Sequence, residues 1–300
     1  MGLIKFTKMI MDAGFPLHLF DKMDDERYLK IAYWCNTGKK LNLTNPKTYN
    51  EKVQWLKLYN RKNIFTTMVD KSTAKDYVSN IVGDECIIPT IGVWDSFDEI
   101  DFEKLPDKFV LKCTHDSGGL VICKDKANFD KEAARKKINK CLKVNYFYYS
   151  REWPYKNVKP RIIAEEYLDA LDSELVEYKM FCFDGEVKMV LVCKGSAHGG
   201  GRTNDYCDTE LNRLPFTCYY PNSKGNLEKP KELPELIKFA EVLSKDIPLL
   251  RVDTYLVNGK IYFGELTFFH NSGYYPIEPD EWDGKIGEWI KLPEKKIVKE

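Results

Sequence analysis

The sequence predicts an α+β fold in which mixed or antiparallel sheets follow a helical N-terminal region. From Lys8 to about Asn80, apolar residues recur at three- and four-residue spacing, which is the period of a helix. Beyond that region, short apolar runs alternate with polar helical stretches. Two pairs of these runs are joined by the hairpin dipeptides Asp184-Gly185 and Asn258-Gly259. Strands separated by both helices and hairpins indicate α+β.

The helical pattern predicts helices at residues 26–34, 52–59, 70–80, 130–142 and 231–245. Thr48 is a candidate N-cap for the second of these, because Glu51 stands three residues later in the spacing of a capping box. Gly83 is expected to end the third helix, and Pro248 closely follows the last.

Extended segments are expected at residues 87–94, 109–113, 120–123, 161–168, 177–183, 186–193, 251–257 and 260–267. The second and third are joined by a glycine-containing turn at 114–119. We expect three regions: a mainly helical one at 1–100 that leads into the first strands, a small lobe at 101–170 and a large lobe at 171–300.

Composition excludes several classes of function. Lys+Arg and Asp+Glu both number 46, so the net charge is zero and no nucleic-acid partner is expected. No apolar run approaches the eighteen residues of a membrane span, and the N-terminus lacks the apolar core of a secretory signal. The nine cysteines never form a CxxC pair, so we interpret them as reduced thiols and expect a cytoplasmic protein.

The most informative motif lies near the C-terminus. Arg251 and Asp253 share one face of a strand, and the hairpin at Asn258-Gly259 brings Glu265 within about a residue of Asp253 on the neighbouring strand. Two carboxylates among apolar residues repel unless a cation joins them, and oxygen-only ligands favour Mg²⁺. A solvated hairpin face with alternating charges is the alternative.

A second motif joins Lys112, at the end of an apolar strand, to the turn His115-Asp116-Ser117-Gly118-Gly119. An ammonium group beside backbone N–H groups can hold phosphates, although Ser-Gly-Gly is also ordinary turn chemistry. Two weaker signals are Lys71, in the segment that opens the third helix, and Glu165-Glu166 at a strand end. Each of these two alone reads as surface charge.

The order of these motifs resembles the ATP-grasp superfamily, and more closely its TupA-like (teichuronopeptide biosynthesis) family. The resemblance rests on five collinear blocks, at residues 43–52, 105–115, 161–166, 178–185 and 251–273. It implies an ATP-grasp fold, in which two α+β lobes clasp ATP, preceded here by the helical N-terminal region. ATP and Mg²⁺ are the cofactors that it implies.

The resemblance also implies roles for single residues. The implied ATP-binding residues are Lys71, Lys112, His115, Ser117, Gly118, Gly119, Glu165, Glu166, Tyr167, Leu168 and Glu177. Of these, Lys71 and Lys112 resemble the lysines that hold the phosphates, residues 165–168 resemble the adenine-binding hinge, and Glu177 resembles the ribose-binding acid. Arg251 and Lys112 are the implied catalytic residues.

Asp253 and Glu265 resemble the metal ligands of the family. Thr267 stands where the family usually has asparagine, and Asn271 is the substitute ligand from the following loop. We expect substrate contacts from a glycine-rich loop at 195–202, although a surface loop without a role is the alternative. The candidate substrate-binding residues are Lys179, His198, Arg202 and Gly273.

The implied activity is ATP-dependent ligation of a carboxylate to an amine through an acyl phosphate. The family context suggests that an amino acid or amine is joined to a uronic-acid carboxylate during synthesis of capsule or another bacterial surface polysaccharide. The alternatives are a sugar kinase, an accessory protein of a glycosyltransferase cluster and a non-catalytic nucleotide-binding protein. No Asp-x-Asp motif of a glycosyltransferase occurs in the chain, and the oligomeric state stays open.

Overall fold

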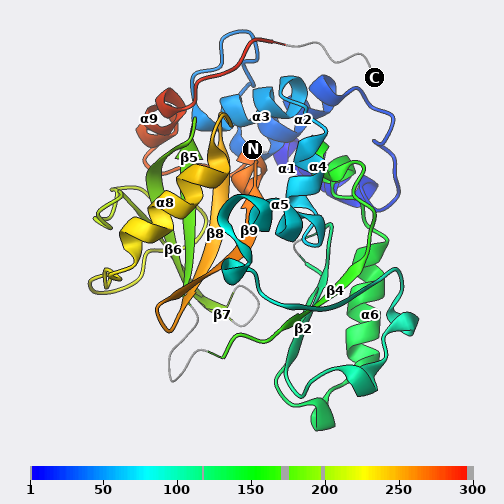
Figure 1. Cartoon of the computed structure of the whole chain (residues 1–300). Coiled ribbons are helices and arrows are strands. Elements are labelled where there is room, and N and C mark those ends of the chain that lie inside the picture. The colour runs from blue at the N-terminus through cyan, green and yellow to red at the C-terminus, as the bar shows by residue number, and fades with distance from the viewer. Residues whose placement is uncertain (1, 117, 170–175, 197–199, 296–300) are drawn as a thin grey trace.

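The computed structural model describes residues 2–116, 118–169, 176–196 and 200–295. It contains two antiparallel sheets that lie below a group of N-terminal helices (Figure 1). The N-terminal helices are α1 (Gly2–Gly14), α2 (Asp25–Thr37), α3 (Tyr49–Tyr59), α4 (Ile64–Val69) and α5 (Thr73–Val82). Among the described residues, no helix is both long and apolar enough to span a bilayer.

Local sequence signals set the ends of the N-terminal helices. Thr48 and Glu51 form the predicted capping box of α3, in which each side chain bonds the backbone of the other residue. Gly83 follows the last residue of α5, with φ of 94°, where a side chain would be strained. The third helix begins at Thr73 rather than at residue 70, because the Asp70 carboxylate accepts a bond from the Ser72 amide and holds a turn there.

The smaller sheet has the strand order β1-β4-β2-β3. Its strands are β1 (Thr90–Trp94), β2 (Phe109–Cys113), β3 (Leu120–Cys123) and β4 (Ile162–Glu166). The predicted polar helix is present as α6 (Lys131–Leu142), and it packs on β2 and β3. The core between them is closed by Phe109, Leu111 and Ile138, all fully buried.

The larger sheet has the order β7-β6-β5-β8-β9. Its strands are β5 (Glu177–Phe183), β6 (Glu186–Ser196), β7 (Gly200–Cys207), β8 (Leu250–Val257) and β9 (Lys260–Thr267). Both predicted hairpins are present, and Asp184 and Asn258 adopt the positive φ of a tight turn. Helix α8 (Leu233–Ser244) packs on β5, β6 and β8, and α9 (Glu281–Trp289) packs on α3 (Figure 1).

The prediction of a loop across residues 195–202 is wrong at both of its ends. Strand β6 continues to Ser196, and β7 begins at Gly200 and pairs with it, so that Lys194 lies opposite Thr203. Gly195, Gly200 and Gly201 therefore belong to the paired strands β6 and β7. Glycine permits positive φ as well as the extended backbone, and here Gly195 and Gly201 take φ of 77° and 73°.

Side chains of α3 hold the turn at His270–Gly273 by hydrogen bonds. Gln54 donates to the carbonyls of Ser272 and Gly273 at 2.9 Å each, and the buried Lys57 ammonium donates to Ser272 at 2.8 Å. A Cβ at Gly273 would lie 2.6 Å from the Gln54 and Val53 side chains, so the turn can approach α3 only with glycine there. The N-terminal helices thus support a turn that follows β9.

Candidate active site

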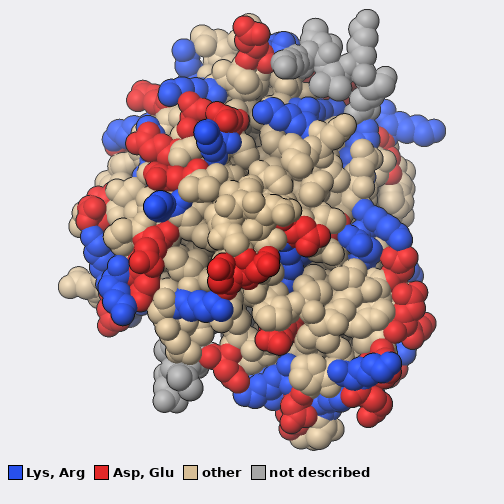
Figure 2. Space-filling view, in the orientation of Figure 1, with Lys and Arg blue, Asp and Glu red and all other residues tan. Residues whose placement is uncertain are grey.

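A wide cleft of about 1980 Å³, open to solvent, is lined by residues of both sheets. The smaller sheet contributes Lys112, Leu120 and Ile122, and the larger sheet contributes side chains of all five of its strands. The charged side chains that line it are Lys71, Lys112, Asp116, Glu177, Lys179, Arg202, Arg251 and Glu265. Charges of both signs are also interspersed on the face of the molecule shown in Figure 2. The cleft therefore gathers charged groups from segments far apart in the sequence.

Arg251 is the centre of the charged groups on the larger sheet. Its guanidinium binds Asp253 through two parallel bonds, with Nε 2.6 Å from Oδ1 and Nη2 2.8 Å from Oδ2. The same Nη2 lies 2.9 Å from Glu265 Oε1 and 3.0 Å from Thr267 Oγ1. Asp253 and Glu265 lie directly opposite each other on β8 and β9. A planar fork of donors is the group that can hold two carboxylates in this way.

Lys179 extends this network along the neighbouring strand β5. Its ammonium forms an ion pair with Asp253 and lies 2.7 Å from Glu177 Oε1, while Arg202 Nη2 lies 3.4 Å from Glu177 Oε2. Burial opposes the charge on Lys179, but Asp253 and Glu177 together raise its pKa. Positive and negative groups on four strands, β7, β5, β8 and β9, therefore alternate from Arg202 to Glu265.

Glu265 is the more accessible of the two opposed carboxylates. Its side chain is 33% exposed, whereas that of Asp253 is fully buried. Burial acts to raise the pKa of Glu265, but Lys71, Arg251 and Lys179 outweigh it and lower the pKa to about 2. Glu265 therefore stays ionised throughout the physiological range and faces the cleft.

The smaller sheet supplies a separate group of charges. Lys112 Nζ lies 2.5 Å from Glu165 Oε2, and Lys75 Nζ lies 2.6 Å from Glu165 Oε1. Lys75 also donates to the Ile88 carbonyl, at 2.6 Å. Burial lowers the pKa of Lys75, and the Glu165 carboxylate opposes that shift. Glu165 is thus a buried carboxylate clamped between two lysines.

Lys71 connects the two groups. Its ammonium donates to the Asp116 carbonyl in the glycine-containing turn and lies 3.9 Å from Glu265 Oε2. The Asp116 carboxylate is buried and accepts from the Gly119 amide at 3.0 Å. Lys71 therefore stands where the turn of one sheet comes close to the carboxylate of the other.

Comparison with protein families decides the affiliation of the chain. Residues 51–291 match the model described as TupA-like ATPgrasp, which is most of the sequence. The chain belongs to the TupA-like ATPgrasp family. The predicted affiliation and ATP-grasp fold class are therefore confirmed.

Solved structures similar to this TupA-like chain include three ligases or synthetases, all at low sequence identity. The D-alanine–D-alanine ligase from Bacillus anthracis complexed with ATP is 17% identical, with a TM-score of 0.39, over 67% of this chain and 55% of that one. The phosphoribosylamine–glycine ligase from Thermotoga maritima is 15% identical, with a TM-score of 0.43, over 70% and 50%. An N5-carboxyaminoimidazole ribonucleotide synthetase in complex with ADP is 12% identical, with a TM-score of 0.43, over 80% and 56%.

This TupA-like chain therefore matches only about half the length of each of those proteins. No curated protein matches the chain.

Several of the implied ATP-binding residues lie apart from the cleft lining. The buried His115 ring has Nε2 3.0 Å from the Val144 carbonyl, and burial lowers its pKa. The hinge amide of Glu166 donates to the Pro89 carbonyl at 3.1 Å, and the Tyr167 ring packs near the ammonium groups of Lys108 and Lys124. The implied ATP-binding residues outside the cleft lining are His115, Gly118, Glu165, Glu166, Tyr167 and Leu168. Ser117 lies outside the described residues.

The implied metal ligands of this TupA-like chain do not all converge. Asp253, Glu265 and Thr267 form an oxygen-only donor set of the kind that Mg²⁺ prefers, with Thr267 Oγ1 3.2 Å from Glu265 Oε1. Asn271 points elsewhere, because its amide donates to Cys218 Sγ at 3.7 Å. Within the described segments, no cluster of three His, Cys, Asp or Glu side chains could hold a metal. The first three residues fit a hard cation, and the fourth does not join them.

The implied substrate-binding residues are divided in the same way. Lys179 and Arg202 line the cleft, and Arg202 lies on β7 rather than in a loop. Gly273 is buried against α3 and does not face the cleft. His198 lies outside the described residues.

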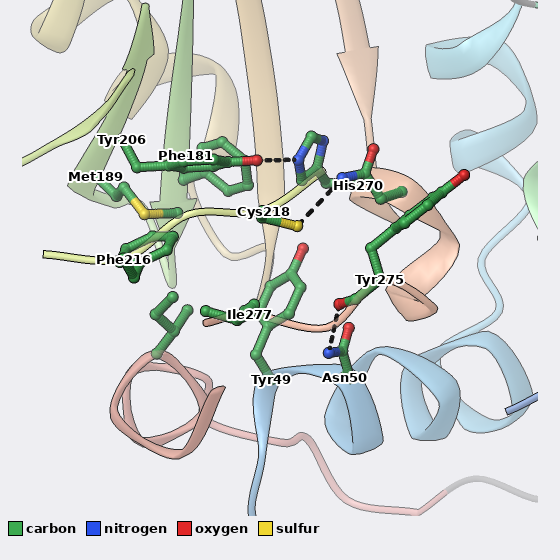
Figure 3. Close-up of a pocket in the computed structure, with 12 residues that line it drawn as sticks. Tyr49, Asn50, Phe181, Met189, Tyr206, Phe216, Cys218, His270, Tyr275 and Ile277 are labelled. Carbon is green, nitrogen blue, oxygen red and sulfur yellow. Dashed lines mark hydrogen bonds between the residues drawn. The ribbon is translucent and has the colours of Figure 1, made fainter. Parts of the chain in front are cut away.

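Sequence reasoning missed His270, which contacts Arg251 directly. Its Nδ1 lies 2.5 Å from Arg251 Nη1, and its Nε2 lies 3.0 Å from the Tyr206 hydroxyl (Figure 3). Arginine only donates, so Nδ1 accepts and the ring proton sits on Nε2, from which it donates to Tyr206. Burial, and then Arg251 and Lys179, lower the pKa of His270 well below its usual range, so the ring is neutral.

Lys75 and Asp116 were missed as well. Lys75 follows Lys71 by four residues, a spacing that could have suggested a second lysine on the same side of the segment. Asp116 stood inside the turn that sequence reasoning selected, but nothing in the sequence predicts that its carboxylate binds the Gly119 amide.

Proposed function

We propose that this TupA-like protein is an ATP-dependent ligase that joins a carboxylate to an amine through an acyl phosphate. The observation that carries the proposal is the cluster of Arg251, Asp253, Glu265 and Lys71 at the point where the two sheets face one cleft. A cation cluster beside an accessible carboxylate suits phosphoryl transfer, in which positioning and charge neutralisation do most of the work.

In the proposed reaction, Lys71 and Lys112 hold the phosphate oxygens of ATP. Both ammonium groups line the cleft and are partly exposed, at 16% each, so phosphate can reach them. Lys112 then exchanges part of its contact with Glu165 for phosphate, while Lys75 keeps that carboxylate paired. The turn that carries Asp116 and Gly119 lies beside them in the lining of the cleft.

Glu265, Asp253 and Thr267 are the proposed ligands of Mg²⁺. When bound, the ion neutralises charge on the transferring phosphoryl group. Glu265 is the ligand open to the cleft, and Asp253 becomes available only if it gives up contacts with Arg251 or Lys179. When Arg251 gives up a contact with Asp253, its freed N–H group donates to the oxyanion that forms when the amine attacks the acyl phosphate.

The substrates are proposed from the family context. They are an amino acid or another amine and a uronic-acid carboxylate, within the synthesis of a bacterial surface polysaccharide. Lys179 and Arg202 are the cleft cations proposed to bind the substrate carboxylate or phosphate. We propose a cytoplasmic location, where ATP is supplied.

Trapping with hydroxylamine tests the reaction type. The protein is incubated with ATP, Mg²⁺ and a uronic acid or its nucleotide conjugate, first without and then with a panel of amino acids. Formation of the acyl phosphate releases ADP. The acyl phosphate then gives a hydroxamate and phosphate with hydroxylamine, or an amide and phosphate with the amine. A phosphorylated sugar that resists hydroxylamine would instead identify a kinase, and ATP binding without ADP from any carboxylate would identify a binding protein.

A further inference from the structure

The first helix exposes an apolar face that no part of the described chain covers. The exposed fractions of Leu3, Phe6, Met9 and Ile10 are 69%, 55%, 58% and 43%. At the spacing of a helix, these four side chains fall within an arc of roughly 120° on α1. Scattered apolar residues on a surface need no explanation, but a continuous face does.

Folding does not account for this face, because α1 packs through its opposite side. Met11 packs against the small core formed around α2, Gly14 lies against the Phe20 ring, and Lys8 Nζ donates to Asn36 at 2.5 Å. The helix is therefore attached by one face while it presents the other to solvent. The exposed apolar face of α1 is therefore not needed to pack the helix on the rest of the chain.

The turn that follows α1 continues the exposed apolar surface. Leu17 and Leu19 are each 66% exposed. Of the thirteen large apolar side chains that are exposed among the described residues, six belong to residues 3–19. This concentration in one short segment marks an interaction surface rather than a random scatter.

Basic side chains lie beside this turn. Lys136, Lys140 and Lys143 follow one another at helical spacing at the C-terminal half of α6 and are all exposed. They line one depression together with Phe15 and Pro16 of the turn. In the N-terminal segment itself, Lys5, Lys8 and Lys22 are matched by Asp12, Asp21 and Asp24, so the excess of positive charge comes from the three lysines at the end of α6. The surroundings of the apolar surface are therefore net positive.

We propose that α1, the turn at 15–19 and the lysines of α6 form a docking surface for an anionic lipid bilayer. An amphipathic helix lies in the plane of the bilayer interface with its apolar side chains among the acyl chains, and lysines beside it bind anionic headgroups. A second copy of the chain fits less well. A two-fold contact would set the same surface against itself and bring the lysine rows toward one another.

The side of α1 that packs on the rest of the chain borders a groove that reaches the cleft. A groove beside α1 is lined by Lys8, Met11 and Asp12 and, at its other end, by Asn271 and Tyr275, which also line the cleft. The docking itself does not depend on the proposed ligase activity.

Flotation with lipid vesicles tests the proposal on the full chain. Vesicles of phosphatidylcholine alone are compared with vesicles that also contain phosphatidylglycerol, at low and at high salt. The expected result is binding to the anionic vesicles only, weakened by salt. The variant Phe6→Ser/Ile10→Ser should lose binding at least tenfold. Lys136→Gln/Lys140→Gln should lose about 25-fold at low salt, since each lysine contributes about fivefold.

Matched controls remove the same groups from another surface. Val242 is 45% exposed and Lys238 is exposed, both on α8, so Val242→Ser and Lys238→Gln should bind vesicles as the unchanged protein does. Thermal unfolding verifies that every variant is folded. Equal binding to uncharged vesicles, or binding that survives the Phe6→Ser/Ile10→Ser change, would overturn the proposal. So would a dimer in solution that this double variant abolishes, with no vesicle binding by the unchanged protein.

Discussion

The Glu265 carboxylate is held by hydrogen bonds on one oxygen and still faces the cleft with the other. Arg251 Nη2 and Thr267 hold Oε1, while Oε2 faces Lys71 at 3.9 Å and leaves the carboxylate partly exposed to the cleft. Its partner Asp253 has no such freedom, because Arg251 and Lys179 occupy both of its oxygens. Of the two opposed acids, Glu265 is the one whose neutralisation should affect chemistry more than folding.

Glu265→Gln should therefore abolish most turnover and leave the protein folded. The amide keeps the size and one acceptor of the side chain, but the charge that would bind a cation is lost. A loss of several kcal/mol of charge stabilisation corresponds to at least about a hundredfold in rate. ADP release and thermal unfolding measure the two effects, with Glu235→Gln as the control, since that carboxylate is exposed on α8 and does not line the cleft. Undiminished ADP release by the Glu265 variant would refute the metal assignment.

His270 is expected to act on the reaction by positioning Arg251. His270→Phe removes the acceptor 2.5 Å from Arg251 Nη1, and the freed guanidinium should lower kcat by about 10- to 100-fold with little change in KM for ATP. His270→Asn restores an acceptor near the place of Nδ1 and should recover part of the rate. A purely structural role would instead lower the melting temperature of both variants alike and leave kcat per folded molecule unchanged.

The sequence predicts the pairing of Asp253 with Glu265 to within one residue, and a single irregularity in the strands explains the difference. Counting back from Asn258-Gly259 places residue 253 opposite about 264, whereas the strands are irregular between Asp253 and Thr254 and bring Glu265 opposite instead. A bulge adds one residue to one strand, and hydrophobic alternation does not reveal it. The contacts of His270 and Lys75 depend on which distant segments pack together, which no local pattern contains.

At the scale of elements, the periodic segments were well predicted and the irregular ones were not. The capping box of α3 and both hairpins follow from short-range signals in the sequence. Strand β7 was missed because its first residues, Gly200 and Gly201, resemble a loop, and only their pairing with Ser196 of β6 makes them part of a strand. Helix α9 was missed because two glycines interrupt its nine residues.

Those two glycines of α9 should respond in opposite ways to alanine. At Gly287 a Cβ would collide with the Lys47 carbonyl and lie 2.7 Å from Thr48 C, so Gly287→Ala should push α9 from the N-terminus of α3 and cost about 1–3 kcal/mol. At Gly284 a Cβ would meet nothing, so Gly284→Ala should stabilise the helix by about 0.5–1 kcal/mol. Urea unfolding of the two variants measures both changes. Equal shifts would show that α9 does not pack this tightly on α3.

At the scale of the whole molecule, the two sheets and the N-terminal helices meet around a few buried cations. The predicted regions at 1–100, 101–170 and 171–300 remain a prediction, and strand β1 of the first pairs with β4 of the second. Arg151 is fully buried and lies 3.0 Å from Asp25, while Lys57 joins α3 to the Ser150 and Ser272 carbonyls at 2.9 and 2.8 Å. Sequence reasoning could not find these contacts, because a lone Lys or Arg on a helix or loop is usually a surface residue.

Lys57 should make stability depend on pH above neutrality. Burial lowers the pKa of Lys57 to about 7, against a weaker opposing effect of Glu152. The unfolded chain keeps the lysine proton up to about pH 10.4, so above pH 7 it binds more protons than the folded chain, and this group makes stability rise with pH. Between pH 7 and 8.5 this group alone should add about 1–2 kcal/mol. Ionisation of unfolded cysteines lowers stability over the same range, but it is common to the protein and to its Lys57 variant.

Lys57→Met isolates that contribution. The variant should be less stable at every pH, because the Ser150 and Ser272 carbonyls lose a buried donor, at about 1–3 kcal/mol for each group left unpaired. The pH dependence is the sharper test. Only the unchanged protein has Lys57, which loses its proton on folding, so its free energy of unfolding should exceed that of the variant by more at pH 8.5 than at pH 7. Lys52→Met is the control, since Lys52 also bonds carbonyls, those of Gly287 and Ile290, but is only partly buried. A difference that stays constant with pH would mean that Lys57 remains charged in the folded protein, held by its three oxygen acceptors rather than discharged by burial.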